Sequence, residues 1–592
     1  MTPPEHTAPA PGGGLPWIRR HPRLHRNINR AVVITLILFA IGQVVVRTVE
    51  LPMGWSLIRF VTYGMIVYVT IMGLLWLTLC SRFSRRTVWT VTTLVLVAIG
   101  GAASMIRSWS WTGDSWLAFE WRWQKTADER LEEYQKSRSS ESQPVVAAAI
   151  EPITPEDMPT YRGTNHDGYV VGPPIREDWS ATPPEVLWKH EVGGGFAQPV
   201  VVGSHLVTIE QRRDDEVVVL YDAATGNERW TYSTPGKFDA MGGPGPRATP
   251  VIHEGKVYAL GALGHLACLD LATGSRLWSR EILGDFGVPN QTWGITSSPL
   301  VHNDWLIVNV GGFYGGGLIA LQLADGTDVW KSDGITAKEG QPPAVAEPQL
   351  QKAGDLPQAT DGDHAVPQTG ARNLAGYATP VIVTIAGVPQ ILNYDGIGLW
   401  GHAIEDGRIL WFHLFQNAPA VNVAQPILLP DDRILISASY GKGSRLLQIK
   451  KDGEQWSASK LWEDLKSLES KMSSPVLIEG HVYGLDEGFL TCINPATGKQ
   501  TWKKSRAAQF GHGQLLVNNG LLIVLAENGD LVLIRPQPDQ LVVLGKFHVL
   551  DGEKTWNPPA LVRGRLYVRN HHEMACVDIS ANTPARTAEA GK

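Results

Sequence analysis

The sequence predicts an all-β body folded as an eight-bladed β-propeller and preceded by three transmembrane α-helices. Two observations support this prediction. Three long apolar segments lie within the first 110 of the 592 residues, and the rest of the chain repeats one short motif at a spacing of roughly 40–50 residues, which is typical of propeller blades. The composition agrees, because 43% hydrophobic residues can bury a large core, which excludes a disordered chain, and four cysteines are too few for a disulfide scaffold.

The three apolar segments span residues 31–46, 60–79 and 88–106, within a predicted anchor of residues 31–107 that follows a basic N-terminus of residues 1–30. The second and third segments have no charged residue over roughly the 20 positions that a bilayer core requires. The first is shorter and contains Gln43, so a cleaved signal peptide is the alternative. No small-residue cleavage site follows it, and two further segments come directly afterwards, which favours a retained helix.

Arginines flank these segments unevenly. The N-terminal region and the short loop after the second segment are rich in them (Arg19, Arg20, Arg23, Arg26, Arg30; Arg82, Arg85, Arg86), whereas the loop after the first segment has only Arg47, Glu50 and Arg59. Because Arg-rich loops stay in the cytoplasm, three spans place everything after Arg107 on the other side. The sequence therefore predicts a multi-pass protein of the inner (cytoplasmic) membrane, held in membrane lipid by its anchor, with its body in the periplasm.

Residues 108–159 form the predicted connection between the anchor and the body. Six aromatic residues gather at its start (Trp109, Trp111, Trp116, Phe119, Trp121 and Trp123), a density typical of the membrane–water interface; a buried amphipathic helix is the alternative. Residues 124–142 are charged and helix-prone, and residues 143–159 are rich in Ala and Pro. We expect these two stretches to form a stalk and a linker.

The repeated motif is Asp-x-x-Thr-Gly-x-x-x-Trp. Full copies begin at Asp222 and Asp270, a copy with Asn in first place begins at Asn494, and weaker copies end at Trp330 and Trp411. Asp or Asn can accept backbone N–H groups at the start of a turn, Gly supplies the positive φ that a short hairpin needs, and the Trp can fill space between neighbouring sheets. Short apolar runs separated by such turns predict an all-β repeat.

Eight units can be counted from the residues that open their first strands, which are Pro199, Pro250, Pro299, Pro380, Pro426, Pro475, Gln514 and Pro559. The seventh unit lacks the Gly-turn motif, so seven blades is the alternative. The last unit lacks an outer strand, and residues 186–192 can supply it, which would close the ring and leave no free sheet edge. The predicted propeller spans residues 160–580, with a loop insertion at residues 332–374 beside the channel mouth and a tail of residues 581–592.

These units, together with Tyr-Arg-Gly-Thr-Asn-His-Asp-Gly at residues 161–168, resemble the PQQ-repeat (quinoprotein-like) β-propeller superfamily of bacteria. The resemblance covers residues 161–579 and implies the fold more strongly than an activity. The superfamily contains pyrroloquinoline-quinone (PQQ)-dependent dehydrogenases, the scaffold of the outer-membrane β-barrel assembly machinery, and binding propellers. Arg162, Asn165 and Asp167 lie in the stretch 161–168, whose turn-forming residues favour a structural plug of the ring.

The resemblance makes PQQ with Ca²⁺ a possible cofactor, but this sequence departs from the dehydrogenase pattern. The alcohol-dehydrogenase branch has two adjacent cysteines, whereas Cys268, Cys492 and Cys576 fall at equivalent places in different units, as buried small side chains do. No acidic pair can be assigned to Ca²⁺. His571 and His572 would point to opposite faces of a strand, which disfavours a shared metal. We therefore predict no metal site and assign no cofactor.

The residues just before each first strand line the channel mouth in such a ring. Those that could bind a cofactor or another ligand are Arg247, Trp293, Tyr377, Asn422, Lys471, His512 and Asn557. Cationic, amide and aromatic groups of this kind suit an anionic or polar ligand. The alternative is that these side chains satisfy loop backbones and hold water. No catalytic residue can be assigned from the sequence.

These observations predict a membrane-anchored, extracytoplasmic propeller that binds a small-molecule ligand or an envelope protein. The alternatives are a PQQ-dependent membrane dehydrogenase that oxidises a sugar or alcohol, and an assembly scaffold for envelope proteins. Nucleic acid is not expected as a partner, because the net charge is −6 and the excess of Lys and Arg lies in the N-terminal region.

Overall fold

The computed structural model describes residues 22–48, 55–79, 84–111, 117–139, 150–240, 242–312, 314–336, 373–417, 419–502, 505–552 and 554–581. The chain divides into two compact units, Met1–Lys125 and Thr126–Lys592. Most of the predicted 332–374 insertion and nearly all of the 581–592 tail lie outside the described residues.

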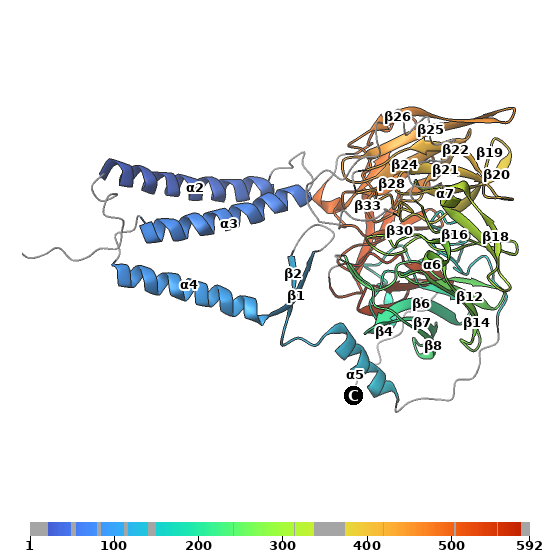
Figure 1. Ribbon diagram of the computed structural model, residues 1–592, viewed down its shortest axis with the longest axis horizontal. Coiled ribbons are helices and arrows are strands. Elements are labelled where there is room, and N and C mark those ends of the chain that lie inside the picture. The colour runs from blue at the N-terminus through green and yellow to red at the C-terminus, as the bar shows by residue number, and fades with distance from the viewer. Residues whose placement is uncertain are drawn as a thin grey trace, which may run out of the picture. The chain divides into compact units, whose positions relative to one another are not determined.

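The described residues of the first unit form three helices and one hairpin (Figure 1). The helices are α2 (Pro22–Thr48), α3 (Trp55–Leu79) and α4 (Arg85–Met105), and the hairpin pairs β1 (Ile106–Trp111) with β2 (Leu117–Trp121). Ser84 caps α4, because its hydroxyl accepts a hydrogen bond from the Thr87 N–H at 3.2 Å. The predicted apolar segments are helical, except that Ile106, the last residue of the third, begins β1.

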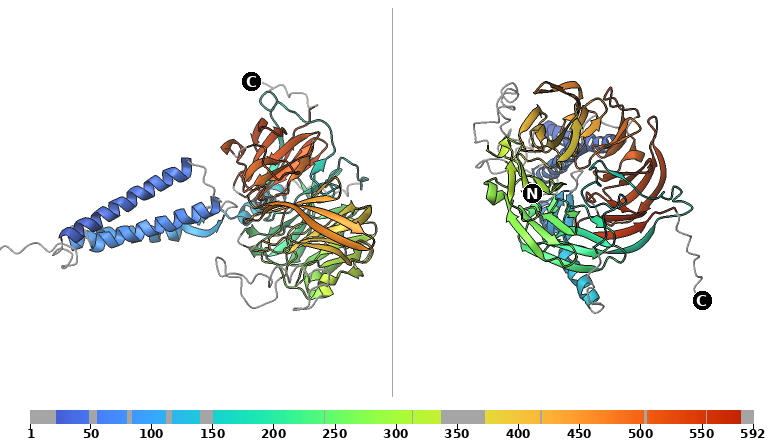
Figure 2. Two further views of the ribbon diagram at one scale, coloured as in Figure 1. Left: turned by 90° about the horizontal axis from the view of Figure 1, so that it is seen from above. Right: turned by 90° about the vertical axis from the view of Figure 1, so that its right-hand side faces the viewer.

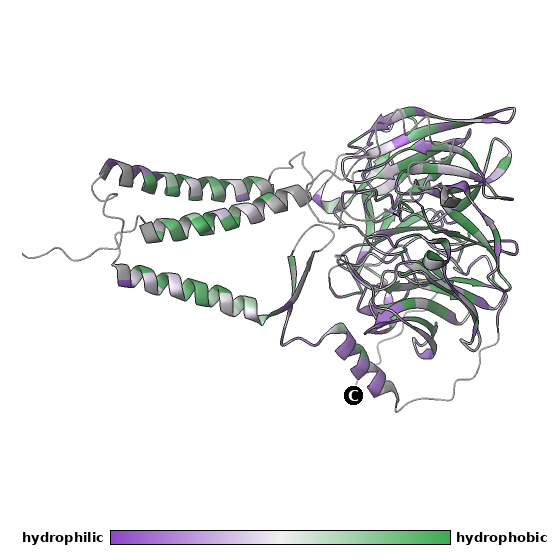
Figure 3. Ribbon diagram, viewed as in Figure 1, coloured by the Kyte–Doolittle hydropathy of each residue, from purple (hydrophilic) through white to green (hydrophobic). Residues whose placement is uncertain are grey.

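Two of the three helices meet the requirements of a membrane span by length and composition. These stretches are Arg26–Val45 and Arg86–Met105, whereas α3 contributes a shorter apolar stretch among the described residues, Val61–Leu77. Apolar side chains such as Leu38 and Leu94 point outward, and Figure 3 shows hydrophobic colouring along the helices. The prediction of three transmembrane helices is thus too high by one for the described residues, because the middle apolar stretch is shorter than a bilayer core requires.

The second unit is an eight-bladed β-propeller, and its sheets are arranged radially in chain order (Figure 2, right). The first four blades are β5 (Val200–Val202), β6 (His205–Arg212), β7 (Asp215–Asp222) and β8 (Glu228–Pro235); β11 (Val251–His253), β12 (Lys256–Leu260), β13 (His265–Asp270) and β14 (Arg276–Glu281); β15 (Leu300–His302), β16 (Trp305–Asn309), β17 (Leu318–Gln322) and β18 (Asp328–Lys331); and β19 (Val381–Ile385), β20 (Val388–Tyr394), β21 (Gly398–Ala403) and β22 (Ile409–Leu414).

The remaining four blades follow the same antiparallel order. They are β23 (Ile427–Leu429), β24 (Arg433–Ala438), β25 (Gly443–Asp452) and β26 (Gln455–Asp464); β27 (Val476–Ile478), β28 (His481–Asp486) and β29 (Phe489–Ile493); β30 (Gln514–Asn518), β31 (Leu521–Leu525), β32 (Asp530–Arg535) and β33 (Val542–His548); and β34 (Ala560–Val562), β35 (Arg565–Arg569), β36 (Glu573–Asp578) and β4 (Glu185–Glu191). Short elements connect some blades: β9 (Asp239–Ala240), β10 (Gly243–Pro244), α6 (Ile282–Phe286), α7 (Asp333–Thr336) and η1 (Arg506–Ala508). The prediction of eight blades is confirmed.

The ring closes with strands from both ends of the propeller sequence. β4 precedes the first blade in the chain but pairs with β36 of the last blade, with Trp188 opposite Cys576. This pairing confirms the closure predicted from residues 186–192. The sixth blade has three strands among the described residues, because the segment after β29 pairs with it only at the two isolated bridges Ile493↔Gln500 and Phe489↔Gln509 and not as a continuous fourth strand.

The motif Trp joins neighbouring blades. The Trp230 indole Nε1 donates to the Leu271 carbonyl of the next blade at 2.9 Å, and a Cβ added to Gly274 would lie 2.6 Å from the Trp230 ring. Glycine is therefore required at position 274 for two reasons: it leaves room for the Trp230 ring, and it supplies the positive φ of the turn. We call this pair of contacts, an indole hydrogen bond to a carbonyl of the next blade and packing of the ring on a turn glycine, the joint. It recurs at three other Trp residues, with the carbonyl and the glycine in that order: Trp188 with Ala223 and Gly226, Trp278 with Leu323 and Gly326, and Trp462 with Pro495 and Gly498.

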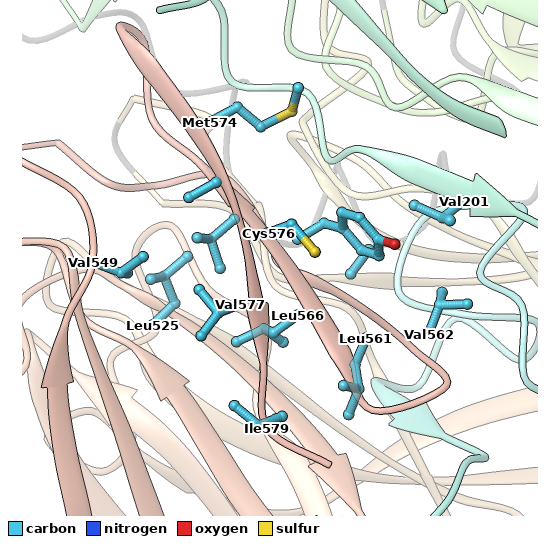
Figure 4. Packing of buried hydrophobic residues seen from close by; sticks show 14 of the residues in the cluster. Val201, Leu525, Val549, Leu561, Val562, Leu566, Met574, Cys576, Val577 and Ile579 are labelled. Carbon is cyan, nitrogen blue, oxygen red and sulfur yellow. The ribbon is translucent and has the colours of Figure 1, made fainter. Parts of the chain in front are cut away.

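Apolar side chains fill the spaces between blades. The largest cluster joins the seventh, eighth and first blades and includes Met574, Cys576 and Leu525 (Figure 4). Cys268, Cys492 and Cys576 are buried and unpaired in separate blades, as predicted. Burial raises the pKa of Cys268 to about 11 and that of Cys576 to about 12, so these thiols remain protonated.

The predicted charged helix exists as α5 (Ala127–Ser139), but it packs on the propeller instead of standing free as a stalk. Leu131 is buried, the Tyr134 ring stacks on His190 of β4 at 5.1 Å, and Arg130 Nε donates to Glu191 at 3.2 Å. Residues 140–149 of the expected linker lie outside the described residues.

Candidate functional site

The two faces of the ring differ in their connections. In each four-stranded antiparallel blade, the turns between strands one and two and between strands three and four lie on one face, which we call the turn face. The connections between blades lie on the opposite face, together with the turns between strands two and three. We call this opposite face the mouth face, because the predicted channel-mouth residues precede the first strands there.

The segment that precedes the first blade in the sequence covers the centre of the ring on the turn face. Residues 157–176, which we call the plug, bond to four blades. Met158 bridges Val201, Pro159 O accepts from Ile252 N, and β3 (Tyr169–Val170) pairs in parallel with β30, so these three bonds reach innermost strands. Arg176 N donates to Ile579 O, just after the third strand of the last blade. These bonds come from the first, second, seventh and eighth blades. One end of the channel is therefore occupied by the protein's own chain.

Arg162 holds the plug in place. Its guanidinium is buried and donates to the carbonyls of Ser474 and Pro475, just before β27, and of Leu515 in β30, at 3.3–3.4 Å. It also donates to the Asp167 carbonyl at 3.0 Å. Burial lowers the pKa of Arg162. The predicted plug turn is thus present, and within it Asn165 is exposed.

Above the plug, hydrogen bonds link neighbouring blades around the channel. In four places a backbone N–H just before a first strand donates to the hydroxyl at the equivalent position of the next blade: Gln198 to Thr249 (3.2 Å), Thr249 to Ser298 (2.9 Å), Ser298 to Thr379 (3.0 Å) and Gln425 to Ser474 (2.9 Å). Each acceptor precedes the Pro that opens a blade. These hydrogen bonds therefore tie the ends of the mouth-face loops of neighbouring blades to one another.

Arg247 is a central cation of the mouth. Its guanidinium carbon lies 5.2 Å from the Phe196 ring centre and 5.0 Å from that of Phe238, and its Nη2 donates to the Gly243 carbonyl at 2.9 Å. Burial lowers the pKa of Arg247 to about 10, which still leaves it protonated at neutral pH. Among the described residues no carboxylate lies within salt-bridge distance of Arg247. A fixed positive charge is therefore held between aromatic rings.

Aromatic side chains continue the mouth beyond Arg247. Trp293 and Tyr377 meet edge to face with ring centres 5.8 Å apart, and Lys471 Nζ lies 5.7 Å from the Tyr440 ring centre. Burial raises the pKa of Tyr377, so its hydroxyl stays a neutral donor. Arg247, Trp293, Tyr377 and Lys471 all keep part of their surface exposed.

The other three predicted mouth residues are buried. Asn422 donates its amide to the Asp395 and Phe415 carbonyls, and Asn557 donates to those of Gly195 and Ala197. His512 lies against Glu527, which accepts a hydrogen bond from the His512 backbone N–H at 2.9 Å. The structure therefore brings four of the seven predicted residues to the accessible mouth and places three behind it.

Sequence reasoning missed three residues that shape the mouth. Phe238 covers one side of Arg247, Trp556 stacks on Phe196 at 5.3 Å, and Glu527 accepts the Trp556 Nε1–H at 2.9 Å. Trp556 stands three residues before Pro559, as Phe196 does before Pro199, so the repeat register contained a signal for it. Phe238 follows β8 in an irregular connection that the repeat does not predict.

The described residues contain no group of three or more His, Cys, Asp or Glu side chains placed to hold a metal. His571 and His572 lie in the turn before β36, and burial lowers the pKa of His572 to about 4, so the ring is neutral.

Comparison with known proteins places the molecule among PQQ-repeat propellers. A family model described as outer membrane protein assembly factor BamB matches residues 178–350 and 445–577, just over half of the chain. No curated protein matches the sequence. Similar solved structures include BamB from Moraxella catarrhalis (14% identity, 67% of this chain and 99% of that chain, TM-score 0.44), quinohemoprotein alcohol dehydrogenase ADHIIG from Pseudomonas putida HK5 (13%, 74% and 82%, 0.49) and quinohemoprotein alcohol dehydrogenase from Comamonas testosteroni (15%, 77% and 85%, 0.42).

Proposed function

The chain belongs to the family described as outer membrane protein assembly factor BamB, and from this membership we propose that it is a binding propeller of the cell envelope. Its mouth face takes an anionic ligand or an anionic segment of an envelope protein. One observation carries the proposal: the plug occupies the turn face, while Arg247, Trp293, Tyr377 and Lys471 keep exposed surface at the opposite mouth.

The chemistry of Arg247 supports an anionic ligand. The guanidinium rests between two aromatic rings and donates to loop carbonyls, which fixes its position without neutralising its charge. A carboxylate or phosphate that approaches from the mouth would gain a charge-assisted hydrogen bond to a preorganised donor. Trp293 and Tyr377 add flat apolar surface next to this cation.

The family description supports an envelope protein as the partner, since it names an assembly factor for outer membrane proteins. In this chain the body would be tethered through the membrane. We propose that the N-terminal helices anchor the chain in the inner membrane and leave the propeller in the periplasm. The uneven arginine distribution and the two stretches Arg26–Val45 and Arg86–Met105 support this arrangement.

A PQQ-dependent dehydrogenase that oxidises a sugar or alcohol is the second candidate. Arg247 favours it, because the guanidinium could pair with a carboxylate of the quinone. The described residues contain no group of three or more His, Cys, Asp or Glu side chains placed to hold a metal, so no Ca²⁺ ligands are assigned. The described cysteines also lie in separate blades and not side by side.

Site-specific photocrosslinking in native membranes tests the binding proposal. A photoreactive residue at Tyr377 or Lys471 should capture a partner, whereas one at Asp304, an exposed residue of a turn on the turn face, should not. Equal capture from Asp304, or none from the mouth positions, would contradict the proposal. Calorimetry of the full chain with PQQ, with and without Ca²⁺, distinguishes the dehydrogenase from the binding propeller. A dehydrogenase should bind the quinone saturably and should reduce a dye when a sugar or alcohol is supplied.

A further inference from the structure

The hairpin that follows α4 has two chemically different faces. In the β1–β2 register Trp109 stands opposite Phe119, and Ser108 stands opposite Glu120. Because side chains alternate between the faces of a strand, Leu117 and Trp121 share a face with Phe119. Ser108 Oγ donates to Glu120 at 2.7 Å on the other face. One face is therefore aromatic and the other polar.

The aromatic face is open. Trp109 is 60% exposed and Phe119 is 43% exposed, and the neighbouring Trp123 is 65% exposed while it stacks on Trp121 at 4.9 Å. Soluble proteins rarely leave such a cluster of large aromatic rings uncovered. The face therefore requires an apolar or interfacial environment.

The hairpin is fixed to the end of a helix that can cross a membrane. Ile106 opens β1 directly after Met105 ends α4, and Arg122 N donates back to the Met105 carbonyl at 2.9 Å. The Leu117 N–H donates to the Tyr63 hydroxyl of α3 at 3.2 Å. The aromatic face is thus held at one end of the apolar helices and cannot swing freely away from them.

We propose that this hairpin lies in the membrane–water interface, with the Trp109–Phe119 face against lipid and the Ser108–Glu120 face in water. The inference rests on the proposed membrane anchoring. Indole rings favour this zone because the ring body is apolar while the N–H can reach water or a headgroup. The hairpin would fix how deeply the C-terminal end of α4 lies in the bilayer and how that end is oriented.

Quenching of single labels in the full chain, reconstituted into phospholipid vesicles, tests the inference. Cys80 is replaced by Ser, and the three buried cysteines are kept. An environment-sensitive fluorophore is attached in turn to W109C and F119C on the aromatic face, and to the matched controls S108C and E120C on the polar face. L94C, at an exposed position of α4, reports on the span itself.

A nitroxide-bearing lipid should quench the labels at 109 and 119 several-fold more strongly than those at 108 and 120, and aqueous iodide should show the reverse order. If L94C is quenched by lipid but 109 and 119 respond to iodide, the hairpin lies in water and the inference is wrong. If neither quencher reaches 109 and 119, protein covers the face, which also overturns it. If L94C itself escapes lipid quenching, the anchoring on which the inference rests has failed as well.

Discussion

The indole nitrogen of Trp188 donates a hydrogen bond to the Ala223 carbonyl at 3.1 Å. Trp188 lies on β4, the outer strand of the last blade, and Ala223 lies in the turn after the third strand of the first blade. The joint that links successive blades elsewhere therefore also closes the ring. Because β4 precedes the first blade in the chain, the propeller is complete only when residues before the first blade have joined the last one.

The closing joint makes Trp188 important for stability. Trp188→Ala would remove the hydrogen bond, the packing on Gly226 and the stacking on His190, so we expect the free energy of unfolding to fall by about 2–3 kcal/mol for this partly exposed ring. Leu187→Ala, on the same strand but at an exposed position, should cost about 0.5 kcal/mol or less. Urea unfolding of the full chain, followed by circular dichroism, compares the two. Equal effects would show that the joint does not close the ring.

The plug depends on the absence of a side chain at position 168. A Cβ at Gly168 would lie 2.5 Å from Arg162 Nη2, and the residue has a φ of +84°. We expect Gly168→Ala to lower the free energy of unfolding by roughly 2–4 kcal/mol, through both the clash and the backbone conformation. Gly480→Ala is the matched control, since its φ is +79° but nothing lies within 4 Å of the added Cβ, so it should cost about 1–2 kcal/mol. A Gly168→Ala loss no larger than that of the control would contradict the role of Arg162.

Much of the propeller could be predicted because its determinants are local. Asp222 accepts the N–H of Thr225 at the start of its turn, and Gly226 supplies the positive φ, so a nine-residue motif specifies a hairpin. The motif alone does not guarantee the fourth strand. Asn494, Gly498 and Trp502 repeat it in the sixth blade, yet the described residues after β29 pair with that strand only at the two isolated bridges Ile493↔Gln500 and Phe489↔Gln509 and form no fourth strand.

Other parts needed information that the local sequence lacks. The plug pairs Tyr169 with Val517, a contact across most of the propeller, and no local pattern identifies such a partner. The repeat placed Asn422 and Asn557 at the mouth, but their amides turn to loop carbonyls, which depends on the shape of the neighbouring loops. The Trp-rich segment was expected at the membrane interface, with a helix as the alternative; its period-two alternation forms the β1–β2 hairpin instead of a helix.

Glu216 should make stability depend on pH. Burial raises its pKa to about 7, and its Oε1 accepts the Ala262 N–H at 2.9 Å. Between the ordinary carboxyl pKa and about 7 the unfolded chain has lost this proton while the folded chain keeps it, so stability falls as the pH rises through that window. The contribution is on the order of 3 kcal/mol.

Glu216→Gln isolates this contribution, because the amide oxygen can still accept the Ala262 N–H. The variant should lose less stability than the wild type between pH 5 and pH 8, as measured by urea unfolding at each pH. The difference between the two proteins is the informative quantity, since Asp395, whose pKa burial also raises to about 7, titrates in both. Parallel pH profiles would show that Glu216 does not bind a proton in the folded state near neutral pH.

Arg247 should determine the affinity of the mouth for its ligand. Arg247→Gln removes the positive charge but leaves an amide that can reach the loop carbonyls, so the fold should persist. A charge-assisted hydrogen bond contributes about 1.5–3 kcal/mol, which predicts a loss of capture of roughly 10–100-fold. Photocrosslinking from Tyr377, with the chain titrated over a range of concentrations, measures the change. Arg247→Lys should recover part of the affinity, because the charge returns without the planar guanidinium that stacks between Phe196 and Phe238. Unchanged capture by both variants would show that the mouth recognises its partner without this cation.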